Sequence, residues 1–288
     1  MANNVTSLEM GRGPLIGVGR TAEVYAWGDH RVLKLYRVDM PEDWVRHEAR
    51  VARIVSAAGL HAPAIGDGAV GDTAAGAIAA GDIVEVGGRL GIVYERITGP
   101  SMLDTIARRP WTLGRMAQQF AAVHATMHNC ARAELPSQRQ GFIRAILRAP
   151  GLDEATRQRA LNALDRLPDA ESVCHGDYHP DNIILSPRGP VVIDWMTAAC
   201  GNPVADVART VLMFRVAVLP DDVGMAKRVM TQLLRRAFLS AYLRAYHRLR
   251  PLSNAELARW FPILAAARLN EGIVAEEAHL LSLAGKTG

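Results

Sequence analysis

The sequence predicts an α+β fold in which a five-stranded antiparallel sheet with one helix precedes a larger, mainly helical lobe. Three observations support this class. The chain has 288 residues, more than one hydrophobic core usually holds. Several stretches of the first 97 residues alternate between apolar and polar side chains, as strands do, and most of the later chain has apolar residues at helical spacing. We therefore expect two lobes, residues 1–97 and residues 98–288.

The first lobe is expected to contain a three-stranded meander, a helix and a hairpin. Strands are predicted at residues 15–19, 22–27, 32–36, 83–86 and 90–95. Pro41 suits the first turn of a helix that continues to Gly59. Gly87 and Gly88 form a two-residue turn between the last two strands. Residues 61–81 are rich in Gly, Ala and Pro and predict only short pieces of structure.

The second lobe is expected to be helical except for one polar stretch. Residues 173–185 place His, Asp and Asn side chains after a buried strand, and a turn at 186–189 leads into the strand 191–193. The helices are predicted at residues 101–108, 112–130, 137–147, 153–167, 203–219, 222–247, 253–270 and 271–283.

Composition and charge argue against several function classes. The net charge of +4 is small and no dense block of Lys and Arg is present, so we expect no nucleic-acid partner. The three scattered cysteines indicate free thiols in a reducing compartment. The N-terminus lacks the features of a signal peptide, and the most apolar region, 74–86, is too short to span a bilayer. We expect a cytoplasmic protein without a membrane partner, and the sequence leaves its oligomeric state open.

Three side chains of the polar stretch are candidates for phosphoryl-transfer chemistry. Asp177 and Asn182 fit the spacing H-x-D-x-x-x-x-N, with Gly176 at the second position. Asp194 follows the strand 191–193, and the hairpin is expected to return it to the same place. Carboxylate and amide oxygens are ligands that hold Mg²⁺. We predict that Asp177 orients the hydroxyl of a phosphoryl acceptor and that Asn182 and Asp194 ligate Mg²⁺.

A phosphate cradle and a cation are predicted in the first lobe. The turn containing Gly17 and Gly19 follows the pattern G-x-G-x-x-G-x-V, with Ala22 at the third glycine position. Backbone N–H groups of such a turn can approach phosphates. Lys34 lies between apolar neighbours, where a lysine is costly unless an anion meets it. Glu48, on the following helix, is its expected partner.

Further polar residues are expected to support the loop. His175 is predicted to hydrogen-bond to backbone groups, and His179 either does the same or lines the acceptor site. Asp206 either bonds to the backbone of the loop or only occupies a helix N-terminus, where the helix dipole favours a carboxylate. No Cys or third His is spaced as a partner for these histidines, so a zinc site is not expected.

The order and spacing of these motifs resemble the aminoglycoside phosphotransferase and choline kinase family. Three segments carry the resemblance: His-Gly-Asp-Tyr-His-Pro-Asp-Asn at 175–182, Ile-Asp-Trp at 193–195 and Gly-Asn-Pro-Val-Ala-Asp at 201–206. The resemblance implies a bilobal protein-kinase-like fold and transfer of the γ-phosphoryl group of ATP or GTP, with Mg²⁺, to a hydroxyl of a small molecule. It also implies that the linker with Glu95 and Ile97 meets the nucleotide base through backbone groups.

The resemblance leaves the acceptor open between an aminoglycoside-type antibiotic and a metabolite alcohol. A polycationic aminoglycoside needs several acids around its site, and Glu271, Glu276 and Glu277 are candidates unless they only face water. A protein kinase is an alternative, but Asp206 follows Asp194 so closely that little room remains for an activation segment. A non-catalytic nucleotide-binding scaffold is a second alternative, and it predicts the loss of residues that are all present here.

Overall fold

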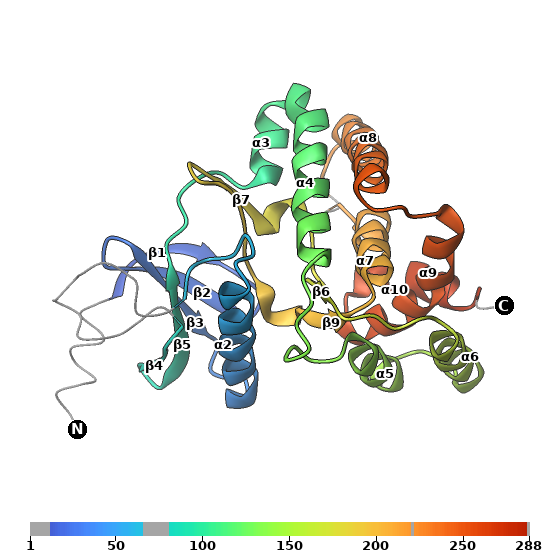
Figure 1. Cartoon of the computed structure of the whole chain (residues 1–288), viewed down its shortest axis with the longest axis horizontal. Helices are drawn as coiled ribbons and strands as arrows, with labels where there is room; N and C mark the ends of the chain where they lie inside the picture. The colour runs from blue at the N-terminus through green and yellow to red at the C-terminus, as the bar shows by residue number, and fades with distance from the viewer. Residues whose placement is uncertain (1–11, 66–80, 220–221, 287–288) are drawn as a thin grey trace. The chain divides into compact units, whose positions relative to one another are not determined.

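The computed structural model describes residues 12–65, 81–219 and 222–286. The chain divides into two compact units, which we call the sheet unit and the helical unit. The sheet unit comprises Met1–Pro100 and Ile183–Met196, and the helical unit comprises Ser101–Asn182 and Thr197–Gly288. Figure 1 shows their elements coloured by position along the chain. The segment Ile183–Met196 therefore belongs to the sheet unit although it lies far along the sequence.

The sheet unit is built on a five-stranded antiparallel sheet with the strand order β1-β2-β3-β5-β4 (Figure 1). Its strands are β1 (Arg12–Val18), β2 (Ala22–Trp27), β3 (Arg31–Tyr36), β4 (Ile83–Val86) and β5 (Arg89–Glu95). The helix α2 (Glu42–Ala57) follows β3. In the sheet, Lys34 of β3 lies opposite Val24 of β2 and Ile92 of β5. Lys34 is therefore on a central strand with neighbours on both sides.

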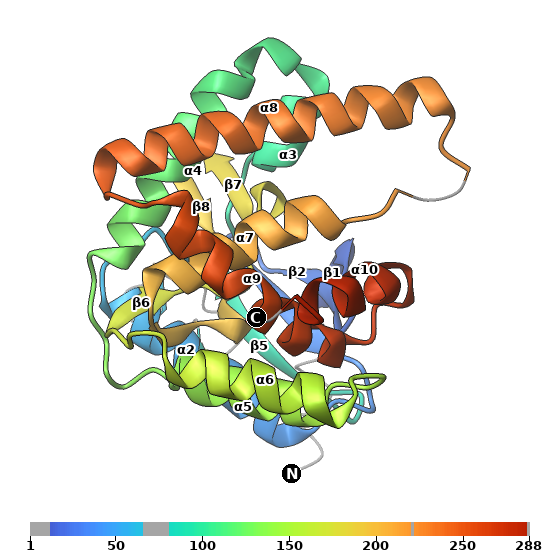
Figure 2. The same ribbon diagram turned by 90° about the vertical axis from the view of Figure 1, so that its right-hand side faces the viewer.

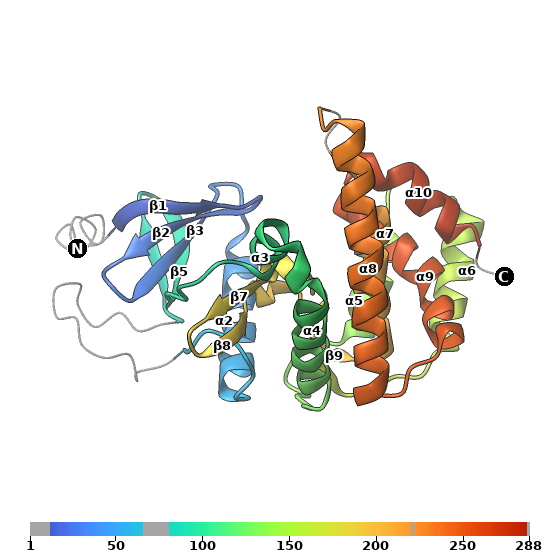
Figure 3. The same cartoon turned by 90° about the horizontal axis from the view of Figure 1, so that it is seen from above.

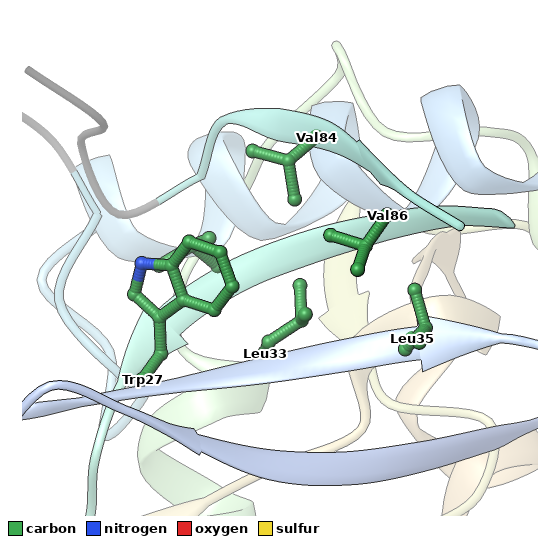
Figure 4. Packing of buried hydrophobic residues seen from close by; sticks show 6 residues of the cluster. Trp27, Leu33, Leu35, Val84 and Val86 are labelled. Atoms are coloured by element: carbon green, nitrogen blue, oxygen red, sulfur yellow. The ribbon is translucent and has the colours of Figure 1, made fainter. Parts of the chain in front are cut away.

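Alternation along β3 separates the two faces of the sheet. Leu33 and Leu35 point into a core cluster that Figure 4 shows from close by. The cluster consists of Trp27, Leu33, Leu35, Val84, Val86 and Val93. Tyr36 belongs to a second cluster, which includes residues of α2. Because successive side chains of a strand point to opposite faces, Lys34 shares with Tyr36 the face that α2 covers.

A short hairpin completes the sheet unit. It consists of β7 (Ile183–Ser186) and β8 (Gly189–Val192), and the turn lies where the sequence predicts it. The backbone N–H of Leu185 donates to the carbonyl of Pro100 at 2.9 Å, and the N–H of Val192 donates to the carbonyl of His61 at 2.6 Å. These bonds tie both strands of the hairpin to earlier parts of the same unit.

The helical unit contains eight α-helices in its described residues. They are α3 (Met102–Arg108), α4 (Leu113–His128), α5 (Gln138–Arg148), α6 (Glu154–Asp165), α7 (Pro203–Val216), α8 (Met225–Leu249), α9 (Asn254–Arg268) and α10 (Val274–Ala284). The long helices α4 and α8 lie side by side (Figure 3). Helix α9 packs between α7 and the pair α5 and α6 (Figure 2), and it also contacts α10. The starts of α3, α5, α6, α7 and α9 are fixed by side chains that accept backbone N–H groups, from Ser101, Ser137, Asp153, Asn202 and Ser253.

The predicted α+β class, with a five-stranded antiparallel sheet and a mainly helical remainder, is confirmed, while some details differ. The sequence analysis missed β9 (Ala199–Gly201), which pairs with β6 (Ser172–Cys174). The last predicted helix begins at Val274 and not at residue 271, because Leu269–Glu271 form a separate short 3₁₀-helix. Most of the segment 61–81 lies outside the described residues. Within the described residues, no helix is long and apolar enough to cross a membrane.

Gly99 is expected to be essential for the junction between β5 and the hairpin. Its φ is +146°, and a Cβ at this position would lie 2.2 Å from the carbonyl oxygen of Leu185. We predict that Gly99→Ala lowers the free energy of unfolding by about 3 kcal/mol or more, because the clash is with backbone that cannot move away. Chemical denaturation would measure this loss.

The matched control is Gly141→Ala in α5, where a Cβ would meet nothing within 4 Å. This change should stabilise the protein by about 0.5–1 kcal/mol, because alanine is the better helix former. Equal stabilities of the two variants would contradict the assigned role of Gly99.

Candidate active site

In the sheet unit, Lys34, Glu48 and Asp194 form one ion-pair cluster. The Lys34 Nζ donates to Glu48 Oε1 at 2.7 Å and to Asp194 Oδ1 at 2.9 Å. Glu48 is buried on the inner face of α2, where the Tyr94 hydroxyl also donates to Oε1 at 3.0 Å. Lys34 thus contacts Glu48, its expected partner, and also Asp194, which the sequence analysis selected separately. Tyr94, which orients Glu48, lies in the predicted strand 90–95, and the sequence analysis gave its side chain no role.

The charge of Lys34 is maintained by its two partners. Burial by itself would lower the pKa of Lys34, but the carboxylates of Glu48 and Asp194 outweigh it and raise the pKa above its ordinary value. The lysine is therefore a cation throughout the physiological range. A buried cation held beside an exposed carboxylate is suited to an anionic ligand that brings its own metal ion.

Asp194 owes its position to an unusual backbone conformation. It follows β8 with a φ of +61°, in the left-handed region that Asp and Asn tolerate better than most residues. The indole N–H of Trp195 donates to the carbonyl of Val192 at 2.9 Å, which anchors the turn. The Asp194 side chain is 45% exposed, so its second carboxylate oxygen is accessible to a metal ion.

The turn between β1 and β2 contains Gly17 and Gly19. The Gly19 N–H donates to the carbonyl of Ala22 at 2.8 Å. Ala22 is itself buried in the core cluster beneath α2, which explains why a methyl group is accommodated at the third glycine position. Arg37 donates from Nε to the carbonyl of Arg20 at 3.0 Å and thereby holds the turn. The sequence analysis missed Arg37, for which the only signal is a basic residue directly after β3.

In the helical unit, β6 leads into the loop that carries Asp177. Two backbone N–H groups of this loop donate to the Asp206 carboxylate, His175 N to Oδ2 at 2.7 Å and Gly176 N to Oδ1 at 2.8 Å. His175 Nδ1 accepts the N–H of Asp177 at 3.2 Å, and the Thr197 hydroxyl donates to the His175 carbonyl at 2.9 Å. The residues before Asp177 are therefore fixed from several sides.

Gly176 is required by the same arrangement. Its φ is +77°, and a Cβ there would lie 2.7 Å from the Thr197 carbonyl oxygen. Any side chain at this position would displace the loop. This explains on steric grounds why glycine occupies the second position of the H-x-D motif.

The side chains of Asp177 and Asn182 are adjacent. Asn182 Nδ2 donates to the Asp177 carbonyl at 3.0 Å, so the amide nitrogen faces the loop and the amide oxygen is left as a possible metal ligand. Burial would raise the pKa of Asp177, but His179, Arg209 and His175 together lower it far below its ordinary value. His179 Nε2 lies 3.6 Å from Asp177 Oδ2. Asp177 is therefore an anion at any pH near neutrality.

An ion-pair chain extends from this loop to the C-terminal helices. Arg209 Nε donates to the Gly176 carbonyl, and another Arg209 nitrogen pairs with Glu271 at 2.6 Å. Arg268 pairs with Glu271 at 3.0 Å and with Glu276 at 2.6 Å. Glu271 and Glu276 are thus engaged by arginines. The sequence analysis missed both arginines, because their partners lie on other elements.

The remaining predicted residues lie in the sheet unit. Glu95 accepts the N–H of Ala64 at 2.8 Å and pairs with Arg188. Ile97 is half-buried, two residues beyond the end of β5. The predicted contact of this linker with a nucleotide base stays a prediction.

Comparison with known proteins follows the same lines as the geometry. The chain matches the phosphotransferase enzyme family over residues 13–252. A search of curated proteins found no match.

Three solved structures illustrate the similarity. The chain has 18% sequence identity and a TM-score of 0.59 to an aminoglycoside-3'-phosphotransferase of type VIII, covering 93% of this chain and 98% of that chain. It has 14% identity and a TM-score of 0.58 to an amicoumacin kinase in complex with AMP-PNP, Ca²⁺ and Ami, covering 100% and 92%. It has 16% identity and a TM-score of 0.57 to a choline/ethanolamine kinase family protein from Mesorhizobium loti, covering 99% and 90%.

At these identities the structural similarity establishes the fold, and the family match establishes the relationship. The match spans most of the chain, from the start of β1 to the residues after α8. It includes the glycine turn, Lys34, the loop with Asp177 and the turn with Asp194. The predicted resemblance is confirmed, and the chain belongs to the phosphotransferase enzyme family.

Proposed function

We propose that this enzyme transfers the γ-phosphoryl group of ATP or GTP, in a Mg²⁺-dependent reaction, to a hydroxyl group of a small molecule. The observation that carries the proposal is the loop 175–182, where Asp177, ionised in the free enzyme, stands beside Asn182. Membership of the phosphotransferase family supports the reaction class. The similar amicoumacin kinase structure contains AMP-PNP and Ca²⁺, which supports a nucleotide and a divalent cation here.

The sheet unit is proposed to hold the nucleotide. The Gly19 N–H is already engaged by the Ala22 carbonyl, so the other backbone N–H groups of the turn with Gly17 and Gly19 are proposed to approach the phosphates, and Lys34 is proposed to supply a cation to them. Glu48 keeps Lys34 charged and fixes the direction of its side chain, since Lys34 Nζ lies 2.7 Å from Glu48 Oε1. Glu95 and Ile97 belong to the linker whose backbone is proposed to meet the base.

The donor atoms fit Mg²⁺. The Asp194 carboxylate is exposed, and the Asn182 amide presents its oxygen, and both are hard ligands of the kind that Mg²⁺ prefers. When bound, Mg²⁺ neutralises charge on the phosphate oxygens. Asp194 and Asn182 are the residues proposed to hold it.

Asp177 is proposed to act on the acceptor. Its carboxylate accepts a hydrogen bond from the acceptor hydroxyl and aims that oxygen at the γ-phosphorus. As the new O–P bond forms, the bond between the γ-phosphorus and the bridging oxygen breaks, the nucleoside diphosphate leaves, and the hydroxyl proton passes to Asp177. The low pKa of Asp177 makes it a weak base, so orientation is its main contribution and proton transfer comes late.

The ion pairs near Asp177 favour an acceptor with few positive charges. A polycationic aminoglycoside would have to compete with Arg209 and Arg268 for the carboxylates of Glu271 and Glu276. We therefore propose a metabolite-type alcohol over an aminoglycoside. The protein-kinase alternative is disfavoured because the residues after Asp194 form a short 3₁₀-helix and β9, with no length left for an activation segment.

Asp177→Asn tests the assignment of the acceptor carboxylate. The acceptor would be the one that gives the fastest release of nucleoside diphosphate in a panel of aminoglycosides, macrolides and metabolite alcohols, with both ATP and GTP. We expect kcat to fall by about a hundredfold or more, because the neutral amide no longer orients the hydroxyl as a carboxylate does and cannot take its proton, while calorimetry shows unchanged nucleotide affinity. The exposed neighbour Asp181→Asn serves as the matched control and should keep full turnover. Full turnover in Asp177→Asn would show that the assignment is wrong.

Asp194→Asn tests the metal site. Calorimetric titration with the nucleotide in the presence of Mg²⁺ should show affinity weakened at least about tenfold, or ~1.4 kcal/mol, because an anionic ligand of the metal is lost. In EDTA the variant and the wild type should differ much less. Asp29→Asn, in the exposed turn between β2 and β3, is the control. An unchanged Mg²⁺-nucleotide affinity would remove Asp194 from the metal site.

A further inference from the structure

A buried polar cluster in the helical unit lies outside the residues assigned so far. His124 and His128 are one helical turn apart on α4, and Tyr242 and Tyr246 are one turn apart on the adjacent α8. The two histidines place Nδ1 at 2.8 and 2.7 Å from the two tyrosine hydroxyls. Both place Nε2 beside Asp206 Oδ2, at 3.1 and 3.2 Å. Two parallel tyrosine–histidine pairs thus converge on one carboxylate.

The protonation of this cluster follows from its burial. Burial lowers the pKa of His124 to about 3 and also lowers the pKa of His128, so both rings are neutral. Burial would raise the pKa of Asp206, but the hydrogen bonds from the two histidines lower it well below its ordinary value. A neutral imidazole has one N–H donor and one acceptor nitrogen. Since Nε2–H donates to Asp206, Nδ1 accepts from the tyrosine hydroxyl.

The tyrosines therefore select the histidine tautomer. Without a hydroxyl at Nδ1, that buried nitrogen would lack a partner, and the proton would be drawn to it. The lone pair of Nε2 would then face the anionic oxygen of Asp206 and repel it. The position of the Asp206 carboxylate depends in this way on hydroxyl groups that do not touch it.

A metal ion is the competing interpretation of the cluster. In the described part of the chain, His124, His128 and Asp206 form a group whose ligand atoms lie within 4.8 Å of one another. However, Asp206 Oδ2 also accepts the N–H of His175, and both histidines already have two hydrogen-bond partners. Hydrogen bonds therefore explain every one of these contacts without a metal ion.

The cluster is connected to the loop with Asp177 by two routes. Asp206 holds the backbone N–H groups of His175 and Gly176, directly before Asp177. The ring of His124 also stacks on Tyr178, directly after Asp177, with centroids 3.9 Å apart and planes at 26°. A change at His124 is therefore transmitted to both neighbours of the proposed catalytic carboxylate. A change at His128 reaches Gly176 through Asp206.

We propose that Tyr242 and Tyr246 are positioning residues of the phosphotransferase reaction, acting through His124 and His128 on Asp206. They set the tautomer of the two histidines and so place the loop that carries Asp177. This inference rests on the proposed role of Asp177. It assigns a function to the C-terminal half of α8, which carries both tyrosines.

Tyrosine-to-phenylalanine variants test the proposal in the full-length enzyme. Tyr242→Phe and Tyr246→Phe should each lower kcat about fivefold, as the loss of one hydrogen bond would, and together about twenty-fold. The Kd of the Mg²⁺-nucleotide should stay within about twofold, because the groups that hold it are unchanged. Ser240→Ala removes an exposed hydroxyl from the same helix and is the matched control, with wild-type kcat expected.

A purely structural role would give a different result. If the melting temperature fell in the phenylalanine variants while kcat of the folded enzyme stayed at the wild-type value, the proposal would be overturned. Two substitutions of His128, compared with each other, provide a second test. The amide nitrogen of His128→Gln can reach the place of Nε2 and donate to Asp206, whereas His128→Asn is too short to do so. Glutamine should retain several times more kcat than asparagine, and equal kcat values would contradict the proposal.

Nitrogen-15 NMR of the histidine rings tests the arrangement without relying on activity. In the wild type both rings should be neutral with the proton on Nε2. Each phenylalanine variant should shift the ring resonances of the histidine that its tyrosine contacts, His124 for Tyr242 and His128 for Tyr246, together with the amide resonances of His175 and Gly176. Unshifted amides, or histidine nitrogen resonances that show a metal ion bound to the rings of His124 and His128, would overturn the proposal. If the wild-type enzyme transferred phosphate to no acceptor, only the proposed function would be refuted. The NMR experiment would still decide whether the tyrosines place the loop.

Discussion

The helical unit depends on one buried anion. Burying a carboxylate without compensation is very costly, and Asp206 is compensated by four donors, the backbone N–H groups of His175 and Gly176 and the rings of His124 and His128. These donors come from the loop that follows β6 and from α4, and Asp206 itself lies on α7. The carboxylate therefore joins three parts of the chain at one point, and the loop with the proposed catalytic residue is built outward from it.

The sheet unit is organised by a compensated charge of the opposite sign. Alternation along β3 directs Lys34 to the face that α2 covers, where Glu48 meets it. Asp194 reaches the same cation from the end of the β7–β8 hairpin. In both units, groups that would be costly alone become fixed reference points once they are paired, and such rigid placement is what phosphoryl transfer requires.

The sequence was sufficient to predict the elements with strong local signals. Residue types at short spacing indicate the hairpin turn at Gly87-Gly88, the helix after Pro41, and the motifs 175–182 and 193–195 in their order. It was insufficient for β9, whose three residues Ala199–Gly201 are too short to show alternation and are strand only because β6 pairs with them. The pairing of Tyr242 with His124 and of Arg209 with Glu271 depends on helix packing between distant segments, which no local pattern records.

The proposed reaction transfers a phosphoryl group to the oxygen of an alcohol. Phosphorus-31 NMR of the enzyme with Mg²⁺, ATP or GTP and an alcohol acceptor tests this reaction directly. We expect the γ-phosphate signal to disappear as a phosphate monoester signal grows, split by the protons on the carbon that carries the new ester. Formation of inorganic phosphate alone, with every acceptor and both nucleotides, would contradict it.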